Sequence, residues 1–148
     1  MTRDKVIGRP MEILLVEDDL EDAGLTIETL KDGGVPCRVN LVRDGEEAMA
    51  FLRHEAHFAR TPRPDLILLD LHLPKKDGRS VLAAVRADRA LRRIPVVVLT
   101  SSRDQWEILK RDDLFVESYL TKPLDCEQFS AVVKSLRKYM LSDVIMPQ

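Results

Sequence analysis

Five short hydrophobic runs along the chain predict five β-strands. They cover residues 11–16, 37–42, 66–69, 94–99 and 116–121. The runs at 66–69 and 94–99 contain only apolar residues, a pattern that indicates strands covered on both faces, as in a parallel sheet between helices. The runs at 37–42 and 116–121 are less apolar than the others, and they predict weaker strands.

A segment with hydrophobic residues at helical spacing follows each of the five runs. Four of these segments begin at a residue whose side chain can cap a helix, namely Asp19, Asp44, Ser102 and Asp125. The first helix is expected to end at Gly33-Gly34 and the third to cover residues 79–88. The last one carries an apolar stripe that extends to Met140.

Strands and helices that alternate in this way predict one α/β domain, a parallel sheet with helices on both faces. The flavodoxin-like, doubly wound strand order 2-1-3-4-5 suits a count of five strands and five helices. This order places the first and third strands side by side. Ligands in open α/β sheets bind outside the carboxyl ends of the strands, at the point where the strand order reverses.

Composition narrows the class of protein further. With 148 residues and 45% hydrophobic residues, the chain is long enough to bury one core without disulfides or a structural metal. Its net charge of -2 and its lack of a long basic stretch argue against DNA binding. Cys37 and Cys126 lack the number and spacing of a disulfide framework or zinc site. We find no signal peptide or membrane span, and we expect a soluble cytoplasmic protein.

Chemically active side chains stand at the ends of four predicted strands. They are Glu17, Asp18 and Asp19 after the first strand, Asp70 after the third, Thr100 after the fourth and Lys122 after the fifth. Taken singly, each of the acids is also a common cap or turn residue, Thr100 a common helix-entry residue and Lys122 an ordinary surface lysine. Together, at successive strand ends of one sheet, they predict a single site.

The residue types in this site favour a metal ion and a phosphoryl group. Clustered carboxylates repel one another unless a cation lies among them, and oxygen ligands without Cys or His favour Mg²⁺. A lysine and a hydroxyl can then stabilise the remaining phosphoryl oxygens. Asp70 is left free to act as a nucleophile that forms an acyl phosphate.

The same residues carry a resemblance to the receiver domains of two-component response regulators, the CheY-like fold. It covers about residues 11–139 and rests on "LLVEDD", "LLDLHLPKKDG", "VVVLTSS" and "YLTKP". The intervals of 30 residues from Asp70 to Thr100 and 22 from Thr100 to Lys122 also match the family. Within it, the chain is most similar to small response regulators that are partners of bacterial phytochromes.

This resemblance implies a role for each site residue. Asp70 is the phosphoacceptor. Mg²⁺ is bound by Asp18, Asp70 and the backbone carbonyl of His72, with Glu17 reaching it through water. Lys122, Thr100 and Tyr119 complete the mechanism, the last two as switch residues, and the peptide bond from residue 122 to 123 is cis. The resemblance thus implies a response regulator phosphorylated by a sensor histidine kinase, a phytochrome, rather than an enzyme that acts on outside substrates.

The domain boundaries follow from the same resemblance and from the apolar tail. We expect an extension at residues 1–10, the receiver domain at 11–140 and a tail at 141–148. Leu141, Val144, Ile145 and Met146 make the tail unusually apolar. This favours a homodimer through the tail, the last helix and the fifth strand, although a frayed terminus is the alternative.

Two other functions fit part of the pattern. A phosphatase of the haloacid dehalogenase type also uses an Asp nucleophile, Mg²⁺ and a lysine, but it places a second Asp two residues after the nucleophile, where this chain has His72. A flavodoxin-like cofactor binder needs aromatic loops around its ring system, and only 5% of this chain is aromatic. The receiver function therefore fits the residues best.

Overall fold

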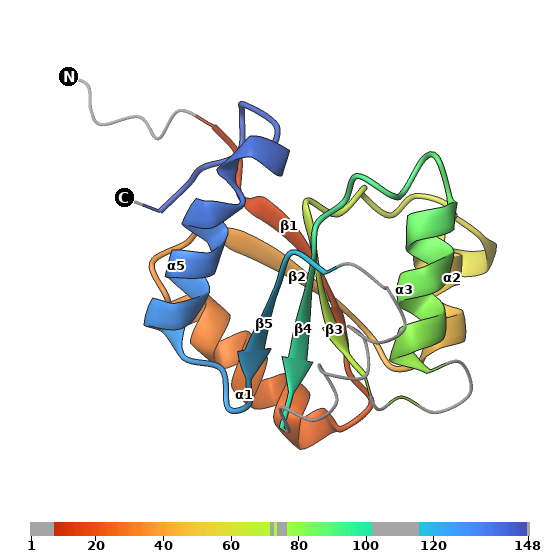
Figure 1. Cartoon of the computed structure of the whole chain (residues 1–148), viewed down its shortest axis with the longest axis horizontal. Helices are drawn as coiled ribbons and strands as arrows, with labels where there is room; N and C mark the ends of the chain where they lie inside the picture. Colours follow the sequence, from red (N-terminus) through yellow and green to blue (C-terminus); the bar gives the residue numbers. More distant parts are fainter. Residues whose placement is uncertain (1–7, 72, 74–76, 102–115, 148) are drawn as a thin grey trace.

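The structure, a computed structural model, describes residues 8–71, 73, 77–101 and 116–147. Its centre is a parallel sheet in the predicted order β2-β1-β3-β4-β5 (Figure 1). The strands are β1 (Met11–Val16), β2 (Cys37–Val42), β3 (Leu66–Asp70), β4 (Val96–Thr100) and β5 (Ser118–Thr121). The predicted sheet is therefore confirmed.

In the part of the chain that the structure describes, two pairs of helices cover the two faces of the sheet. They are α1 (Leu20–Asp32) with α5 (Cys126–Ser135) on one face, and α2 (Gly45–Leu52) with α3 (Gly78–Ala87) on the other (Figure 1). Short 3-10 helices follow α2 and α5, η1 at Ala56–Phe58 and η2 at Arg137–Tyr139. The fourth predicted helix, after the possible cap at Ser102, lies outside the described residues.

Each face of the sheet has its own hydrophobic core. Ile67 and Leu69 of β3 pack with α2 and α3, whereas Leu66 and Leu68 pack on the side of α1 and α5. Successive side chains of a strand point to opposite faces, so a strand covered on both sides must be apolar at every position. This explains the uninterrupted runs that predicted β3 and β4, whose residues are all buried.

Aspartates at the helix starts act as the predicted caps. The Asp19 carboxylate accepts hydrogen bonds from the backbone N–H groups of Glu21 and Asp22, and Asp44 and Asp125 cap α2 and α5 in the same way. Such bonds satisfy N–H groups that have no partner inside the helix. Local sequence thus decides where these helices begin.

The end of α5 differs from the prediction. The helix ends at Ser135, with Leu136 as its C-cap, and η2 follows, so the stripe expected to reach Met140 is not one continuous helix. Met140 still packs against the core from beyond η2. Spacing alone does not distinguish a continued helix from a tighter turn that keeps the same residues on the core side.

The tail folds back onto the start of its own chain. Arg9 N–H donates to the Asp143 carbonyl at 2.7 Å, Ile145 N–H donates to the Arg9 carbonyl at 3.0 Å, and Val144 is only 6% exposed. The tail is therefore not frayed at these residues. Among the described residues, Cys37 and Cys126 are both free thiols, and no helix is long and apolar enough to span a membrane.

Candidate functional site

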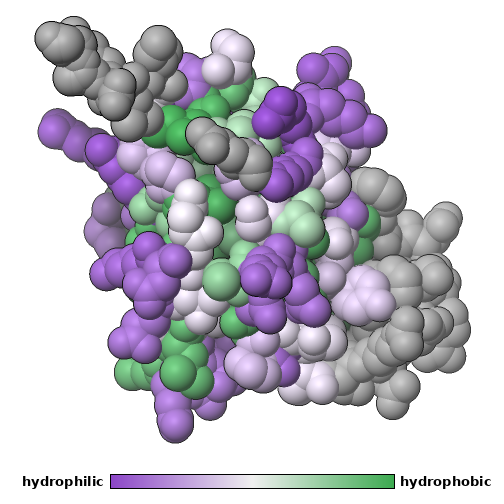
Figure 2. Space-filling model, turned by 90° about the vertical axis from the view of Figure 1, so that its left-hand side faces the viewer, coloured by the Kyte–Doolittle hydropathy of each residue, from purple (hydrophilic) through white to green (hydrophobic). Residues whose placement is uncertain are grey.

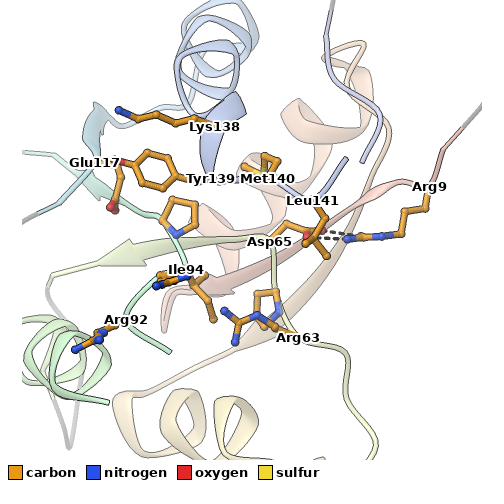
Figure 3. Close-up of a pocket in the computed structure, with 13 residues that line it drawn as sticks. Arg9, Arg63, Asp65, Arg92, Ile94, Glu117, Lys138, Tyr139, Met140 and Leu141 are labelled. Carbon is orange, nitrogen blue, oxygen red and sulfur yellow. Dashed lines mark hydrogen bonds and ion pairs between the residues drawn. The ribbon is translucent and has the colours of Figure 1, made fainter. Parts of the chain in front are cut away.

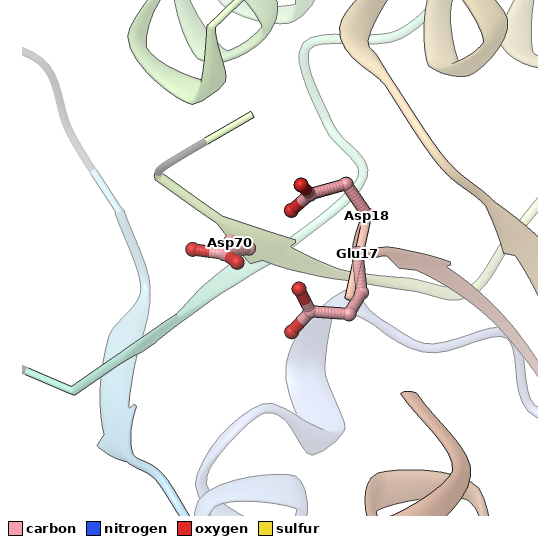
Figure 4. A group of neighbouring side chains, drawn as sticks. All are labelled: Glu17, Asp18 and Asp70. Carbon is pink, nitrogen blue, oxygen red and sulfur yellow. The ribbon is translucent and has the colours of Figure 1, made fainter. Parts of the chain in front are cut away.

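Three carboxylates meet at the carboxyl edge of the sheet (Figure 4). Glu17 and Asp18 directly follow β1, and Asp70 is the last residue of β3. These strands are neighbours, with Val16 paired to Leu69, so their ends lie side by side. One oxygen from each acid lies within 4.8 Å of the others. Glu17 is 1% exposed and Asp70 5%, so the sheet holds two of the three carboxyl groups away from bulk water.

Lys122, just after β5, brings a positive charge to this cluster. Its Nζ donates to Glu17 Oε1 at 2.5 Å, to Asp70 Oδ2 at 3.1 Å and to Asp22 Oδ2 at 3.2 Å. The peptide bond from Lys122 to Pro123 is cis, as the resemblance implied. One ammonium group therefore binds three acids, two of which belong to the carboxylate cluster.

The pKa values of Glu17 and Lys122 are both raised by their surroundings. Burial, together with a hydrogen bond to Asp70, raises the pKa of Glu17 from 4.5 to about 7, although Lys122 opposes this change. Burial alone would lower the pKa of Lys122, but its hydrogen bonds and charge interactions with Glu17 and Asp70 raise it. Lys122 is thus charged at neutral pH. In the absence of a cation, the Glu17 carboxyl loses its proton at a pH close to neutral.

Thr100 and Tyr119 lie on β4 and β5, the two strands that follow β3 across the sheet. Thr100 is the last residue of β4 and is fully buried, and its carbonyl accepts a hydrogen bond from the Lys122 N–H at 2.9 Å. Because Leu99 pairs with Asp70, Thr100 stands one position beyond that carboxylate on the neighbouring strand. Tyr119 lies inside β5, opposite Val98, and is half-buried on the α2–α3 side of the sheet.

The sequence prediction grouped Asp19 with the site acids and missed Asp22. The Asp19 carboxylate caps α1, whereas Asp22, in the first turn of that helix, is the acid that contacts Lys122. The only indication for Asp22 in the sequence was its place near the start of a helix that follows a strand ending in acids. His72, the predicted carbonyl ligand, lies outside the described residues.

The backbone at the start of α3 packs closely against the backbone of Asp70 and Leu71. Gly78 begins α3 and its N–H donates to the Leu71 carbonyl at 3.2 Å. A Cβ at residue 78 would lie 2.5 Å from the Asp70 carbonyl oxygen. An Asp-Gly pair is typical of a turn, but only the fold reveals that glycine is needed at residue 78 for space.

This arrangement suits a divalent cation and a phosphate-like group. The cluster offers only oxygen ligands, which favour hard cations, and the Lys122 ammonium cannot offset three carboxylates together with Asp22. A divalent cation at Glu17, Asp18 and Asp70 would neutralise the remaining negative charge. A bound phosphoryl group could then contact both the cation and the ammonium.

Comparisons with known proteins find relatives over most of the chain. The family model "Response regulator receiver domain" matches residues 13–134. Response regulator Rcp1 of Synechocystis sp. is 43% identical over 138 residues, which cover 93% of this chain and 94% of Rcp1. A solved structure of Rcp1 is titled as its Mn²⁺-bound form and has a TM-score of 0.71, covering 94% of this chain and 100% of that one at 43% identity.

Two further solved structures are similar over most of the chain. The bacteriophytochrome response regulator RtBRR is 42% identical with a TM-score of 0.79, covering 86% of this chain and 78% of its own. The phosphorylated cyanobacterial phytochrome response regulator RcpA is 47% identical with a TM-score of 0.72, covering 94% of this chain and 99% of its own.

Proposed function

Because this chain belongs to the family of response regulator receiver domains, we propose that Asp70 accepts a phosphoryl group from a sensor histidine kinase. The observation that carries the proposal is the position of the Asp70 carboxylate. It is buried at a strand end, 3.1 Å from the Lys122 ammonium and within 4.8 Å of two further acids. In the transfer, an Asp70 oxygen forms a bond to phosphorus as the P–N bond of a phosphohistidine breaks, and the imidazole nitrogen keeps the electron pair.

The side chains around Asp70 have separate roles in this step. Mg²⁺, held by Glu17, Asp18, Asp70 and the carbonyl of His72, would neutralise phosphoryl oxygens when bound. Lys122 places its ammonium on the transferred group by exchanging one of its present carboxylate contacts for a phosphoryl oxygen. The Thr100 hydroxyl donates a hydrogen bond to it.

The negative charge that phosphorylation adds at Asp70 also causes the change in shape that signals to a partner. We assign Thr100 and Tyr119 as the switch, because they lie on the two strands beyond Asp70 and Tyr119 is only half-buried. Tyr119 lines a cavity of about 540 Å³ between β5 and α5, where Gln128 and Val132 form the opposite wall. A change in the position of Tyr119 therefore alters a surface that a partner can contact.

A phytochrome kinase is the partner that we favour, because RtBRR is a bacteriophytochrome response regulator and RcpA a cyanobacterial phytochrome response regulator. Apolar surface beside the site suits the docking of a protein. Leu20 and Leu25 of α1 are 57% and 52% exposed. Figure 2 shows the face that α1 and α5 cover, with hydrophobic residues at its lower end and a larger group near the chain termini.

Phosphotransfer from a purified phytochrome kinase with labelled ATP tests the function. Label should enter the wild-type chain in the presence of Mg²⁺ and should be absent from Asp70→Asn, which keeps the shape of the side chain but lacks the nucleophile. Label on the Asn variant would refute the site assignment. Rapid turnover of p-nitrophenyl phosphate would favour the phosphatase alternative, which the comparisons do not favour.

We also propose a homodimer that uses α5, β5 and the tail. The tail's contribution is its exposed part, since Val144 packs against its own chain while Leu141 is 63% exposed. Leu141→Glu should therefore shift the elution volume in gel filtration toward the monomer, with Arg53→Glu as an exposed control outside these elements. Identical elution of Leu141→Glu and the wild type would show that the tail is not part of the dimer interface.

A further inference from the structure

A second cavity, of about 710 Å³, opens at the opposite end of the sheet from Asp70. In Figure 3, Lys138, Tyr139 and Leu141 lie along one side of it, and Arg63 and Arg92 lie along the other. The strands reach this cavity with their amino ends. It is therefore separated from the acidic site by the length of the strands, about 17 Å for a strand of five residues.

The acids in the wall of this cavity are already paired. Asp65 receives two hydrogen bonds from the Arg9 guanidinium, at 2.8 and 2.9 Å, and a third from the Glu12 N–H. Glu117 receives one from Arg86 at 2.7 Å and one from the Val96 N–H. Both carboxylates are 6% exposed. They cannot neutralise a further cation without giving up these bonds.

Four exposed cations remain at the rim of the cavity. They are Arg63, Arg92, Arg93 and Lys138. Within the described ranges, none of them forms an ion pair with a carboxylate, and Arg63 donates to the Ala90 carbonyl instead. The cavity therefore carries a local positive surplus, although the chain as a whole has a net charge of -2. Such a surplus attracts a ligand with several negative charges.

The floor of the cavity is apolar. Pro64, Ile94 and Pro95 are buried there, Met140 is partly buried, and Tyr139 is 39% exposed at the wall. Arginine side chains and tyrosine rings pack well against flat, unsaturated groups. The volume lies in the range of cavities that hold small organic ligands. The ligand therefore needs an apolar body as well as its charges.

We propose that this cavity binds a small organic anion that carries at least two negative charges and a flat apolar body, the chemistry of a nucleoside phosphate. The arginines and Lys138 bind the charged groups, and the body packs over Ile94 and against Tyr139. This site is independent of phosphoryl transfer at Asp70. It requires neither a divalent cation nor a second protein.

Titration calorimetry of the full chain with ADP in the presence of EDTA tests the proposal. Without a cation, the carboxylate cluster repels ADP, so binding there does not confuse the result. Arg92→Gln/Arg93→Gln should weaken ADP binding at least tenfold. The matched control Lys31→Gln/Arg53→Gln removes the same charge from exposed positions outside the cavity and should change the affinity less than twofold.

Two further measurements separate the charges from the flat body. Tyr139→Leu should weaken ADP binding at least threefold, and pyrophosphate should bind at least tenfold more weakly than ADP. Equal binding of pyrophosphate and ADP would overturn the apolar part of the site. Equal losses in the two double variants, or no ADP binding at millimolar concentration by a folded wild type, would overturn the site itself. Thermal unfolding curves show that each variant is folded.

Discussion

Raising the pH should destabilise the metal-free protein through Glu17. Burial is the main cause that raises the pKa of this carboxyl from 4.5 to about 7, so the folded state binds more protons than the unfolded state between these values. The free energy of unfolding must then fall as the pH rises through this window. A shift of this size corresponds to about 3 kcal/mol, because one pKa unit is worth about 1.4 kcal/mol.

Lys122 does not produce the same dependence. Its pKa is raised above the ordinary value of 10.5, so its contribution to stability is fully present below that pH and is lost only as the pH rises through its folded pKa. Between pH 5 and 8 this contribution is therefore about constant. Glu17 is left as the member of the pair whose ionisation changes the stability in that range.

Urea unfolding in EDTA, followed by circular dichroism from about pH 5 to 8, measures the effect against Glu17→Gln. Stability of the wild type relative to this variant should fall by about 2–3 kcal/mol across the range, because pH 5 already lies slightly above the unfolded-state pKa. Excess Mg²⁺ should remove most of this fall, because a cation at the cluster favours ionised Glu17. Parallel pH profiles for the wild type and the variant in EDTA would refute the reasoning.

Two further predictions concern packing. Gly78→Ala should destabilise the protein by about 1–3 kcal/mol and slow phosphorylation, because its Cβ would lie 2.5 Å from the Asp70 carbonyl oxygen; urea unfolding and transfer rates measure both. Gly24→Ala is the control, with nothing within 4 Å of the added carbon, and equal losses would contradict the explanation. Val144→Ala should cost about 1.6 kcal/mol in urea unfolding, since this side chain is buried. Leu141→Ala, at an exposed position, should change stability by less than about 0.5 kcal/mol, and the opposite order would show that the tail is not docked as described.

The sequence predicted those parts of the site that depend on strand ends. Asp70 and Lys122 each stand where an apolar run ends, and a parallel sheet brings such ends to one edge whatever the details of packing. The contact between Asp22 and Lys122 could not be predicted, because it depends on how α1 is rotated over the sheet. The docking of the tail on Arg9 likewise rests on backbone hydrogen bonds, which leave no pattern in the side chains.

Differences in burial among the strands favour β5 as the element that responds to a charge on Asp70. All residues of β3 and β4 are buried, so the backbones of these strands have little room to move, and the response of Thr100 is confined to its side chain. The β5 strand has four residues, lies at the edge of the sheet and buries only Leu120 fully. It also carries Tyr119 and leads directly to Lys122, whose ammonium contacts Asp70. A new charge at Asp70 therefore acts through Lys122 on a strand that is less constrained than β3 and β4, and a rearrangement there changes the surface between β5 and α5 while both cores stay packed.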